Sequence, residues 1–219
     1  MAAKPVFVTG GTGYIGRPLI GALLARGHAV HALARPGSEA KLPGGALPVA
    51  GNALDASTFA AAIPQGATFV HLIGTPHPNP SKAAEFQRVD LGSIRAATAA
   101  AQRAGVRRFV YVSVAHPAPV MRAYIAARVE GESLVMASGI PATILRPWYV
   151  LGPGHRWPYL LIPFYAVLRW IPATRESAER LGLVTLDAMK AALVRAIEAP
   201  PASGVRIVEV PEIRRTQLL

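Results

Sequence analysis

Near the start of the chain stands the most specific motif of the sequence, Val6-Phe7-Val8-Thr9-Gly10-Gly11-Thr12-Gly13-Tyr14-Ile15-Gly16. It begins as a short apolar run typical of a buried strand and ends in glycines spaced as in a loop between a strand and a helix. In such a loop Gly10 allows the tight turn, Gly13 lets the backbone approach a pyrophosphate, and Gly16 lets the helix pack closely on the sheet. The free N–H groups and the positive end of the helix dipole then face the phosphates. We therefore predict a dinucleotide-binding loop whose contacts come from Gly10, Thr12, Gly13, Tyr14, Ile15 and Gly16.

The rest of the chain alternates short runs rich in Val, Ile and Phe with Ala-rich segments of helical period. This alternation is typical of βαβ units and a parallel sheet. Gly27, Gly105 and Gly139 each follow a helical segment and are predicted to end it in the left-handed conformation, and Asp187 is predicted to cap the last helix. We predict strands at 5–9, 28–34, 47–50, 68–73, 109–113, 141–145 and 206–210, and helices at 14–26, 83–104, 122–138 and 187–198.

These elements predict an α/β fold in a single domain over residues 1–219. The sheet is expected to be a doubly wound parallel sheet of the Rossmann type, in the strand order 3-2-1-4-5-6-7, with helices on both faces. The regular rhythm stops after residue 146, and residues 147–182, rich in Pro, Trp, Tyr and Leu, are predicted to form a small C-terminal substrate lobe. The binding site is expected beyond the carboxyl ends of the strands.

Composition narrows the classes of function. The 219 residues are 52% apolar and 16% charged, which is enough apolar material for a sizeable core, and they include no cysteine. Disulfides, iron–sulfur clusters and cysteine nucleophiles are thereby excluded, and the spacing of the six histidines predicts no metal site. A formal net charge of +11 favours anionic ligands, but the basic residues are scattered, so nucleic-acid binding is not expected. With no signal-peptide pattern and no apolar run of about 20 residues, the chain is expected to be cytoplasmic.

The choice of dinucleotide depends on the end of the second strand. There an acidic residue would accept a hydrogen bond from the adenosine ribose, whereas an arginine would accommodate a 2′-phosphate. The strand 28–34 is followed by Arg35, whose forked guanidinium suits a phosphate. We therefore predict that NADP(H) is preferred, with NAD(H) left open because Glu39 is near enough in sequence to reach the ribose.

Several further motifs carry a family resemblance. They are Gly51-Asn52-Ala53-Leu54-Asp55, Arg107-Arg108-Phe109-Val110-Tyr111-Val112-Ser113, Tyr124-Ile125-Ala126-Ala127-Arg128-Val129-Glu130-Gly131-Glu132 and Ile144-Leu145-Arg146-Pro147. Together with the glycine loop, they resemble the extended and atypical short-chain dehydrogenase/reductases, a group that includes epimerase/dehydratase-like and NmrA-like proteins. The resemblance runs from about residue 5 to 152 and returns weakly at 183–209. It implies that the cofactor is bordered also by Asn52, Ala53, Leu54, Leu72, Ile73, Gly74, Arg128 and Pro147.

The resemblance also implies a catalytic set of Ser113, Tyr124 and Arg128. The family has lysine where Arg128 stands, four residues after the tyrosine and on the same helix face. Arginine supplies the positive field that favours a phenolate and the donors for the nicotinamide ribose, but it does not deprotonate, so a proton relay through this side chain is lost. The alternatives are a hydroxyl at a strand end, a helix aromatic and a solvated charge.

Three functions remain open from the sequence. The first is an NADP(H)-dependent oxidoreductase acting on a small, apolar carbonyl or alcohol. The second is a sensor or assembly protein that binds NADP(H) without turning it over, and the third is a sugar epimerase or dehydratase.

The expected substrate contacts come from the lobe and from His116, just past Ser113. His116, His155 and Trp157 are predicted to line the substrate pocket. The segment 157–170 is interpreted as a lid over an apolar substrate, a homodimer face or a peripheral membrane contact. We favour the first, because the segment directly follows Arg146-Pro147-Trp148-Tyr149, which leaves the sixth strand at the carboxyl edge where the cofactor is expected to end. The apolar wall near the nicotinamide would then be formed by Trp157, Tyr159, Leu160, Leu161, Phe164, Val167 and Leu168.

Overall fold

The computed structural model describes residues 5–153 and 180–216. Its centre is a seven-stranded sheet in the order β3-β2-β1-β4-β5-β6-β9, and every neighbouring pair is parallel. The predicted strand order is therefore confirmed, with strand ends that move by one or two residues. The strands are β1 (Pro5–Thr9), β2 (Ala29–Ala34), β3 (Leu47–Ala50), β4 (Thr68–His71), β5 (Arg108–Val112), β6 (Ala142–Arg146) and β9 (Val205–Glu209).

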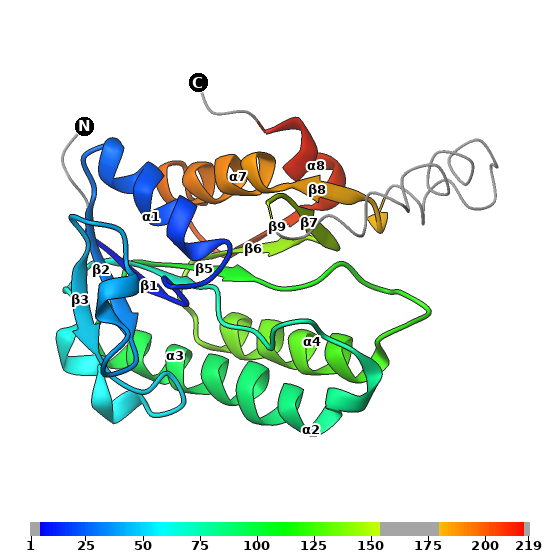
Figure 1. The fold of residues 1–219 in the computed structure, drawn as a ribbon, viewed down its shortest axis with the longest axis horizontal. Helices are drawn as coiled ribbons and strands as arrows, with labels where there is room; N and C mark the ends of the chain where they lie inside the picture. Colours follow the sequence, from blue (N-terminus) through cyan, green and yellow to red (C-terminus); the bar gives the residue numbers. More distant parts are fainter. Residues whose placement is uncertain (1–4, 154–179, 217–219) are drawn as a thin grey trace.

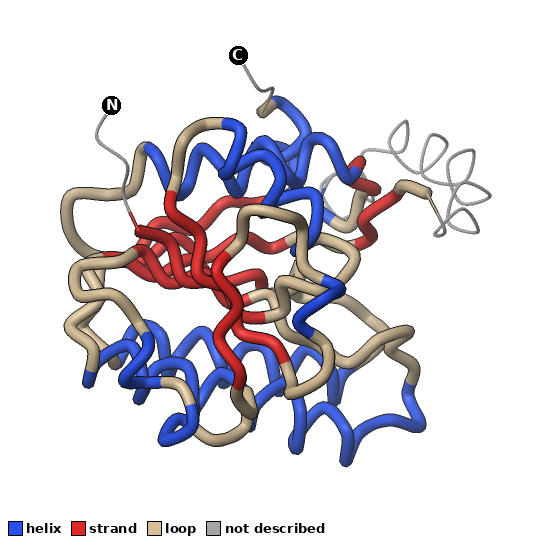
Figure 2. Tube along the Cα trace, turned by 60° about the vertical axis from the view of Figure 1, so that its left-hand side comes forward, coloured by secondary structure: helices blue, strands red, loops and turns tan. Residues whose placement is uncertain are grey.

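Helices cover both faces of this sheet, as Figures 1 and 2 show. One face carries α1 (Gly16–Ala25), α7 (Leu186–Glu198) and α8 (Val210–Arg215). The opposite face carries α2 (Ala83–Glu85), α3 (Gly92–Arg103) and α4 (Arg122–Ala137). This arrangement is the doubly wound α/β fold that the sequence predicts.

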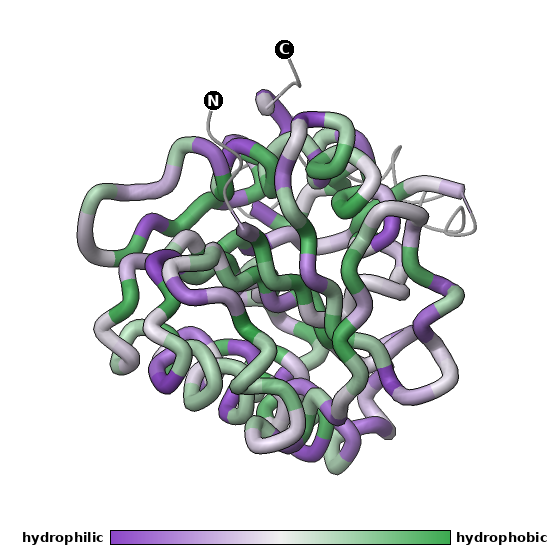
Figure 3. The backbone as a smooth tube through the Cα atoms, turned by 90° about the vertical axis from the view of Figure 1, so that its left-hand side faces the viewer, coloured by the Kyte–Doolittle hydropathy of each residue, from purple (hydrophilic) through white to green (hydrophobic). Residues whose placement is uncertain are grey.

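Two apolar cores fill the spaces between the sheet and its helices. Apolar colouring runs through the middle of the molecule in Figure 3, as expected where parallel strands are buried on both faces. In the second core Phe7, Phe69 and Phe109 are register partners on β1, β4 and β5, and all three are fully buried. Their ring centroids lie 5.2 Å and 5.0 Å apart in turn, so one aromatic ladder ties the three central strands together.

The helix boundaries include three corrections. The helix predicted at 14–26 begins at Gly16. The helix predicted at 83–104 is divided by a π-helical segment, η5 (Phe86–Leu91), between α2 and α3. Asp187 does not cap α7, because that helix begins one residue earlier and the Thr185 hydroxyl accepts from the Ala188 N–H at 3.1 Å. Short 3-10 turns also occur at Glu39–Lys41, Ala56–Thr58, Ala60–Ala62 and Pro80–Lys82.

The predicted helix ends are confirmed, whereas most of the predicted lobe lies outside the described residues. Gly27, Gly105 and Gly139 have φ of +79°, +62° and +70°, which confirms their left-handed conformation. The predicted lobe contains β7 (Tyr149–Leu151), which pairs in parallel with β8 (Leu183–Thr185). Most of the remaining lobe, with His155, Trp157 and the proposed apolar wall, lies outside the described residues. Within the described ranges no helix is long and apolar enough to cross a membrane.

Candidate functional site

The glycine loop folds tightly onto itself at the carboxyl end of β1. Gly10 adopts φ +79°, and its carbonyl oxygen accepts from the Gly13 N–H at 3.0 Å. A Cβ atom on Gly16 would stand 2.2 Å from that same carbonyl oxygen, so only glycine fits where α1 begins. At its glycines the loop therefore presents backbone and the N-terminus of α1 to whatever binds there.

A cavity of about 350 Å³ joins this loop to the ends of β4, β5 and β6. It brings together most of the predicted site, whose members come from separate parts of the chain: Gly10, Gly13, Tyr14, Ile15, Gly16, Leu72, Gly74, Ser113, Tyr124, Arg128 and Pro147. Such a meeting of loops beyond the carboxyl edge is where doubly wound sheets bind their ligands.

The other predicted cofactor residues do not line that cavity. Thr12 and Ile73 are half-buried neighbours of lining residues. Arg35 is exposed directly after β2; its carbonyl accepts from the Ser38 N–H at 2.9 Å, and its side chain makes no hydrogen bond or ion pair with the described residues. Asn52 and Leu54 are exposed after β3, where the Asn52 Oδ1 accepts from the Leu54 N–H at 3.0 Å. Ala53, between them, is half-buried.

Arg128 is a buried cation and not a solvated helix charge. Its Nη2 lies 2.7 Å from Asp90 Oδ1, and its Nη1 donates to the Val112 carbonyl at 3.0 Å. The guanidinium carbon lies 5.2 Å from the ring centroid of Tyr124 and 5.9 Å from that of Tyr111. Burial opposes the charge, but these rings and Asp90 hold the pKa of Arg128 above its ordinary value. The site therefore keeps a permanent positive charge beside Tyr124.

Asp90 is a site residue that the sequence analysis missed. Its carboxylate accepts from the N–H and hydroxyl of Thr75, at 3.1 Å and 2.6 Å, and it pairs with Arg128. The cation packs so closely under the chain that a Cβ on Gly74 would stand 2.1 Å from Arg128 Nη2. The pair thus fixes the loop that follows β4. An acidic residue between two apolar ones, in Val89-Asp90-Leu91, was the available signal.

Ser113 is held by a second carboxylate that was missed. Its hydroxyl donates to Glu132 Oε1 at 2.6 Å, and both residues are buried. The same carboxylate accepts from Nε and Nη2 of Arg146 at 2.9 Å and 2.5 Å. Glu132 follows Arg128 by four residues, as Arg128 follows Tyr124, so helical spacing placed all three on one face.

Two histidines border the buried charges. His116 precedes a cis peptide bond to Pro117, and its Nε2 lies 3.5 Å from Glu132 Oε1, although it does not line the cavity. His71 is fully buried, with its Nδ1 2.8 Å from the Thr9 hydroxyl oxygen. Burial and then the charge of Arg128 lower the pKa of His71 to about 3, so this imidazole is neutral. No group of metal-ligating side chains is found in the described part of the chain.

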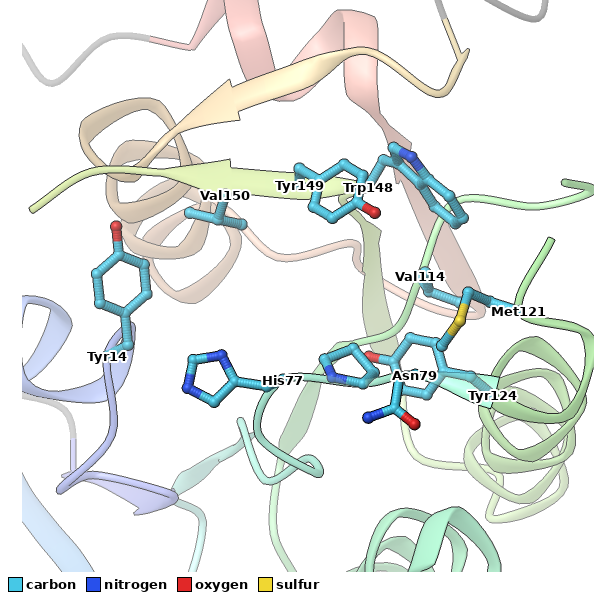
Figure 4. Close-up of a pocket in the computed structure, with 10 residues that line it drawn as sticks. Tyr14, His77, Asn79, Val114, Met121, Tyr124, Trp148, Tyr149 and Val150 are labelled. Carbon is cyan, nitrogen blue, oxygen red and sulfur yellow. The ribbon is translucent and has the colours of Figure 1, made fainter. Parts of the chain in front are cut away.

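A second cavity, of about 490 Å³, adjoins the first. Figure 4 shows its side chains facing one another across the space, with Trp148 and Tyr149 opposite His77 and Tyr124. The two cavities share six lining residues, namely Tyr14, His77, Val114, Tyr124, Trp148 and Val150. Tyr124 therefore stands on the boundary between a groove that begins at the glycine loop and a separate aromatic-lined space.

Comparison with known proteins gives a consistent set of similarities. Residues 10–155 match a protein family described as NAD(P)H-binding. A ceramide reductase from Caulobacter vibrioides is 29% identical over 96% of this chain and 65% of its own length. A 3-diazoavenalumate denitrifying reductase from Streptomyces is 33% identical over 68% of this chain and 57% of its own length. The chain thus spans between half and two thirds of these curated relatives.

Solved structures are similar in fold. The Bordetella bronchiseptica enzyme WbmH in complex with NAD+ has a TM-score of 0.70 and 21% identity, over 96% of this chain and 79% of its own. A short-chain dehydrogenase/reductase superfamily protein from Agrobacterium tumefaciens with bound NAD has a TM-score of 0.68 and 20% identity, over 94% and 77% of the two chains. At this level of identity the likeness shows the fold.

Proposed function

We propose that this chain is an NADP(H)-dependent oxidoreductase. It belongs to the NAD(P)H-binding family within the extended short-chain dehydrogenase/reductases, and the proposal starts from that membership. Its substrate would be a small, apolar carbonyl compound or alcohol. One observation carries the proposal: a single cavity is lined by the glycine loop and by Ser113, Tyr124 and Arg128. Nucleotide binding and proton chemistry would then share one space.

The glycine loop fits the phosphates of a dinucleotide. Gly10, Gly13 and Gly16 put no side chain between the start of α1 and the cavity, and a Cβ on Gly16 would clash with the Gly10 carbonyl oxygen. Leu72, Gly74 and Pro147 would border the rest of the cofactor along the cavity. When bound, NADP(H) supplies a hydride to a carbonyl carbon or accepts one from an alcohol.

Tyr124 is the proposed proton donor to the substrate oxygen. It lines both cavities, so its hydroxyl can serve a substrate in the second while the cofactor lies in the first. The Arg128 charge, 5.2 Å from the tyrosine ring, would stabilise the phenolate that is left after the proton moves. Arg128 itself holds its protons, so the phenolate left by carbonyl reduction would regain a proton from solvent.

A second candidate function is supported by the bonding of Arg128. Two of its nitrogens already serve Asp90 and the Val112 carbonyl, so fewer donors are left for a nicotinamide ribose. A protein of this construction could bind the nucleotide and respond to it without turnover, as a sensor or an assembly protein does.

The experiment that separates these functions compares Tyr124→Phe with Tyr149→Phe. Each variant loses one hydroxyl and keeps its ring, but of these two tyrosines only Tyr124 lines both cavities. We expect Tyr124→Phe to lower carbonyl reduction about 100-fold or more in a substrate screen, since general acid catalysis contributes about 10²- to 10⁴-fold. NADPH affinity should stay within about twofold in both variants, and Tyr149→Phe should stay active.

Full activity of Tyr124→Phe on a confirmed substrate would show that the proton-donor role is wrong. Tight NADPH binding by the wild type, with no reduction across a broad carbonyl panel, would favour the sensor function instead.

A further inference from the structure

The second cavity stands beside Tyr124 and has the size of a small-molecule site. Its volume of about 490 Å³ falls within the ~300–1,000 Å³ of typical ligand pockets and leaves room for a fused-ring compound. Six of its lining residues also line the cavity of the glycine loop. A molecule bound here would therefore lie against Tyr124, next to the site proposed for the cofactor.

The described lining of this cavity holds no Asp, Glu, Lys or Arg. Its polar groups are the phenols, His77, the Asn79 amide and the Trp148 indole, and burial raises the pKa of Tyr149 so that this phenol is neutral. Arg128 belongs to the adjoining cavity and is already paired with Asp90. A charged ligand would be desolvated here without a partner from these residues, which is costly.

Five of the ten described lining residues carry aromatic rings. Trp148 and Tyr149 are consecutive, with ring centroids 5.5 Å apart in an edge-to-face arrangement, and Trp148 packs on the first apolar core. Tyr14, His77 and Tyr124 face them across the space in Figure 4, and the Met121 thioether lies at one side. Rings and thioethers favour an aromatic partner over a saturated one of equal size, because ring quadrupoles and polarisable sulfur add to simple apolar burial.

We infer that this cavity selects an uncharged aromatic ketone, aldehyde or alcohol, and that Trp148 and Tyr149 determine this specificity. That the selected compound is also a substrate rests on the proposed function, but the selection of ligands is a property of the cavity alone. The same absence of Lys and Arg from the described lining makes a nucleotide sugar, with its diphosphate, a poor fit.

The test measures binding without turnover. Three methyl ketones are titrated into the NADP⁺-saturated protein and followed by ligand-observed NMR: 2-acetylnaphthalene, its saturated counterpart 2-acetyldecalin, and 6-acetyl-2-naphthoate, which adds a carboxylate. We expect 2-acetylnaphthalene to bind about tenfold more tightly than either of the others. Tyr149→Leu, which removes the ring, should reduce that preference to about twofold. Tyr149→Phe, which keeps the ring, should retain the preference with unchanged NADPH affinity.

Each possible result bears either on the selection of ligands by the cavity or on the proposed oxidoreductase function. Equal or tighter binding of 2-acetyldecalin or of the naphthoate, or no binding of 2-acetylnaphthalene, would overturn the inference. Retention of the full preference by Tyr149→Leu would overturn the role of Tyr149. If that variant fails to fold, the ketone series on the wild type still decides the class. Selective binding of 2-acetylnaphthalene without NADPH-dependent reduction would support the cavity assignment and contradict the oxidoreductase function. Equal reduction of the aromatic and saturated ketones would support the oxidoreductase function and contradict the selection of aromatic ligands by the cavity.

Discussion

At the scale of single residues, the site is organised by two buried carboxylates beneath it. Asp90 holds Arg128, and Glu132 holds Ser113. Glu132 also pairs with Arg146, and its Oε1 accepts the hydrogen bond that the Ser113 hydroxyl donates. The Ser113 proton is therefore committed to Glu132, and the serine offers lone pairs to the cavity. A substrate hydroxyl can donate to Ser113, whereas a carbonyl oxygen needs its donor from Tyr124.

The proposed preference for NADP(H) also depends on one residue, Arg35. We expect the wild type to bind NADP(H) about 10- to 100-fold more tightly than NAD(H), because a charge-assisted bond to the 2′-phosphate is worth ~1.5–3 kcal/mol. Arg35→Glu should abolish or invert the preference in a titration of both cofactors. Arg107→Glu is the matched control, since it makes the same change in net charge at an exposed residue before the amino end of β5. Equal affinities in the wild type would contradict the NADP(H) proposal.

At the scale of elements, the glycine loop works because α1 begins against the carbonyl of Gly10. We expect Gly16→Ala to weaken NADPH binding at least tenfold, because its Cβ would stand 2.2 Å from that backbone oxygen and the loop would have to open. Gly21→Ala on the same helix is the control: its Cβ meets nothing within 4 Å, so it should retain binding and raise stability by up to ~1 kcal/mol. Cofactor fluorescence titration and thermal unfolding measure both effects. Unchanged affinity in Gly16→Ala would mean that the loop does not hold the phosphates.

The sequence predicted the elements whose signal is local. Buried parallel strands are apolar along their length, and the left-handed glycines after α1, α3 and α4 follow directly from chain geometry. The π-helical segment at Phe86–Leu91 has no such pattern. Thr185 was overlooked as a cap because Asp187 is an equally good capping residue two positions later. The bonds of Asp90 and Glu132 join distant segments, and a single sequence does not reveal such pairs.

At the scale of the whole molecule, the central sheet encloses a histidine that cannot easily take up a proton. His71 pairs in register with Thr9 across β4 and β1, with Ser93 Oγ 3.2 Å from its Nε2 and the Arg128 charge nearby. The unfolded chain binds a proton at this imidazole below its ordinary pKa of 6.5, whereas the folded protein does so only near pH 3. The stability that depends on neutral His71 is therefore complete above pH 6.5 and is lost as the pH falls toward 3.

This linkage predicts the acid sensitivity of the fold. Between pH 6.5 and 4 the unfolding free energy of the wild type should fall by about 3 kcal/mol more than that of His71→Gln, because the slope for one proton approaches ~1.4 kcal/mol per pH unit. Groups such as Asp55 and Glu198, whose pKa values are also lowered, titrate in both proteins and cancel in the difference. Thr9→Val is the matched control, since it removes the bond to Nδ1 but keeps the imidazole, so it should be less stable at every pH with the wild-type slope. Urea unfolding at half-unit pH steps gives the three curves. Parallel curves for the wild type and His71→Gln would show that the imidazole takes up its proton in the folded protein as readily as in the unfolded chain.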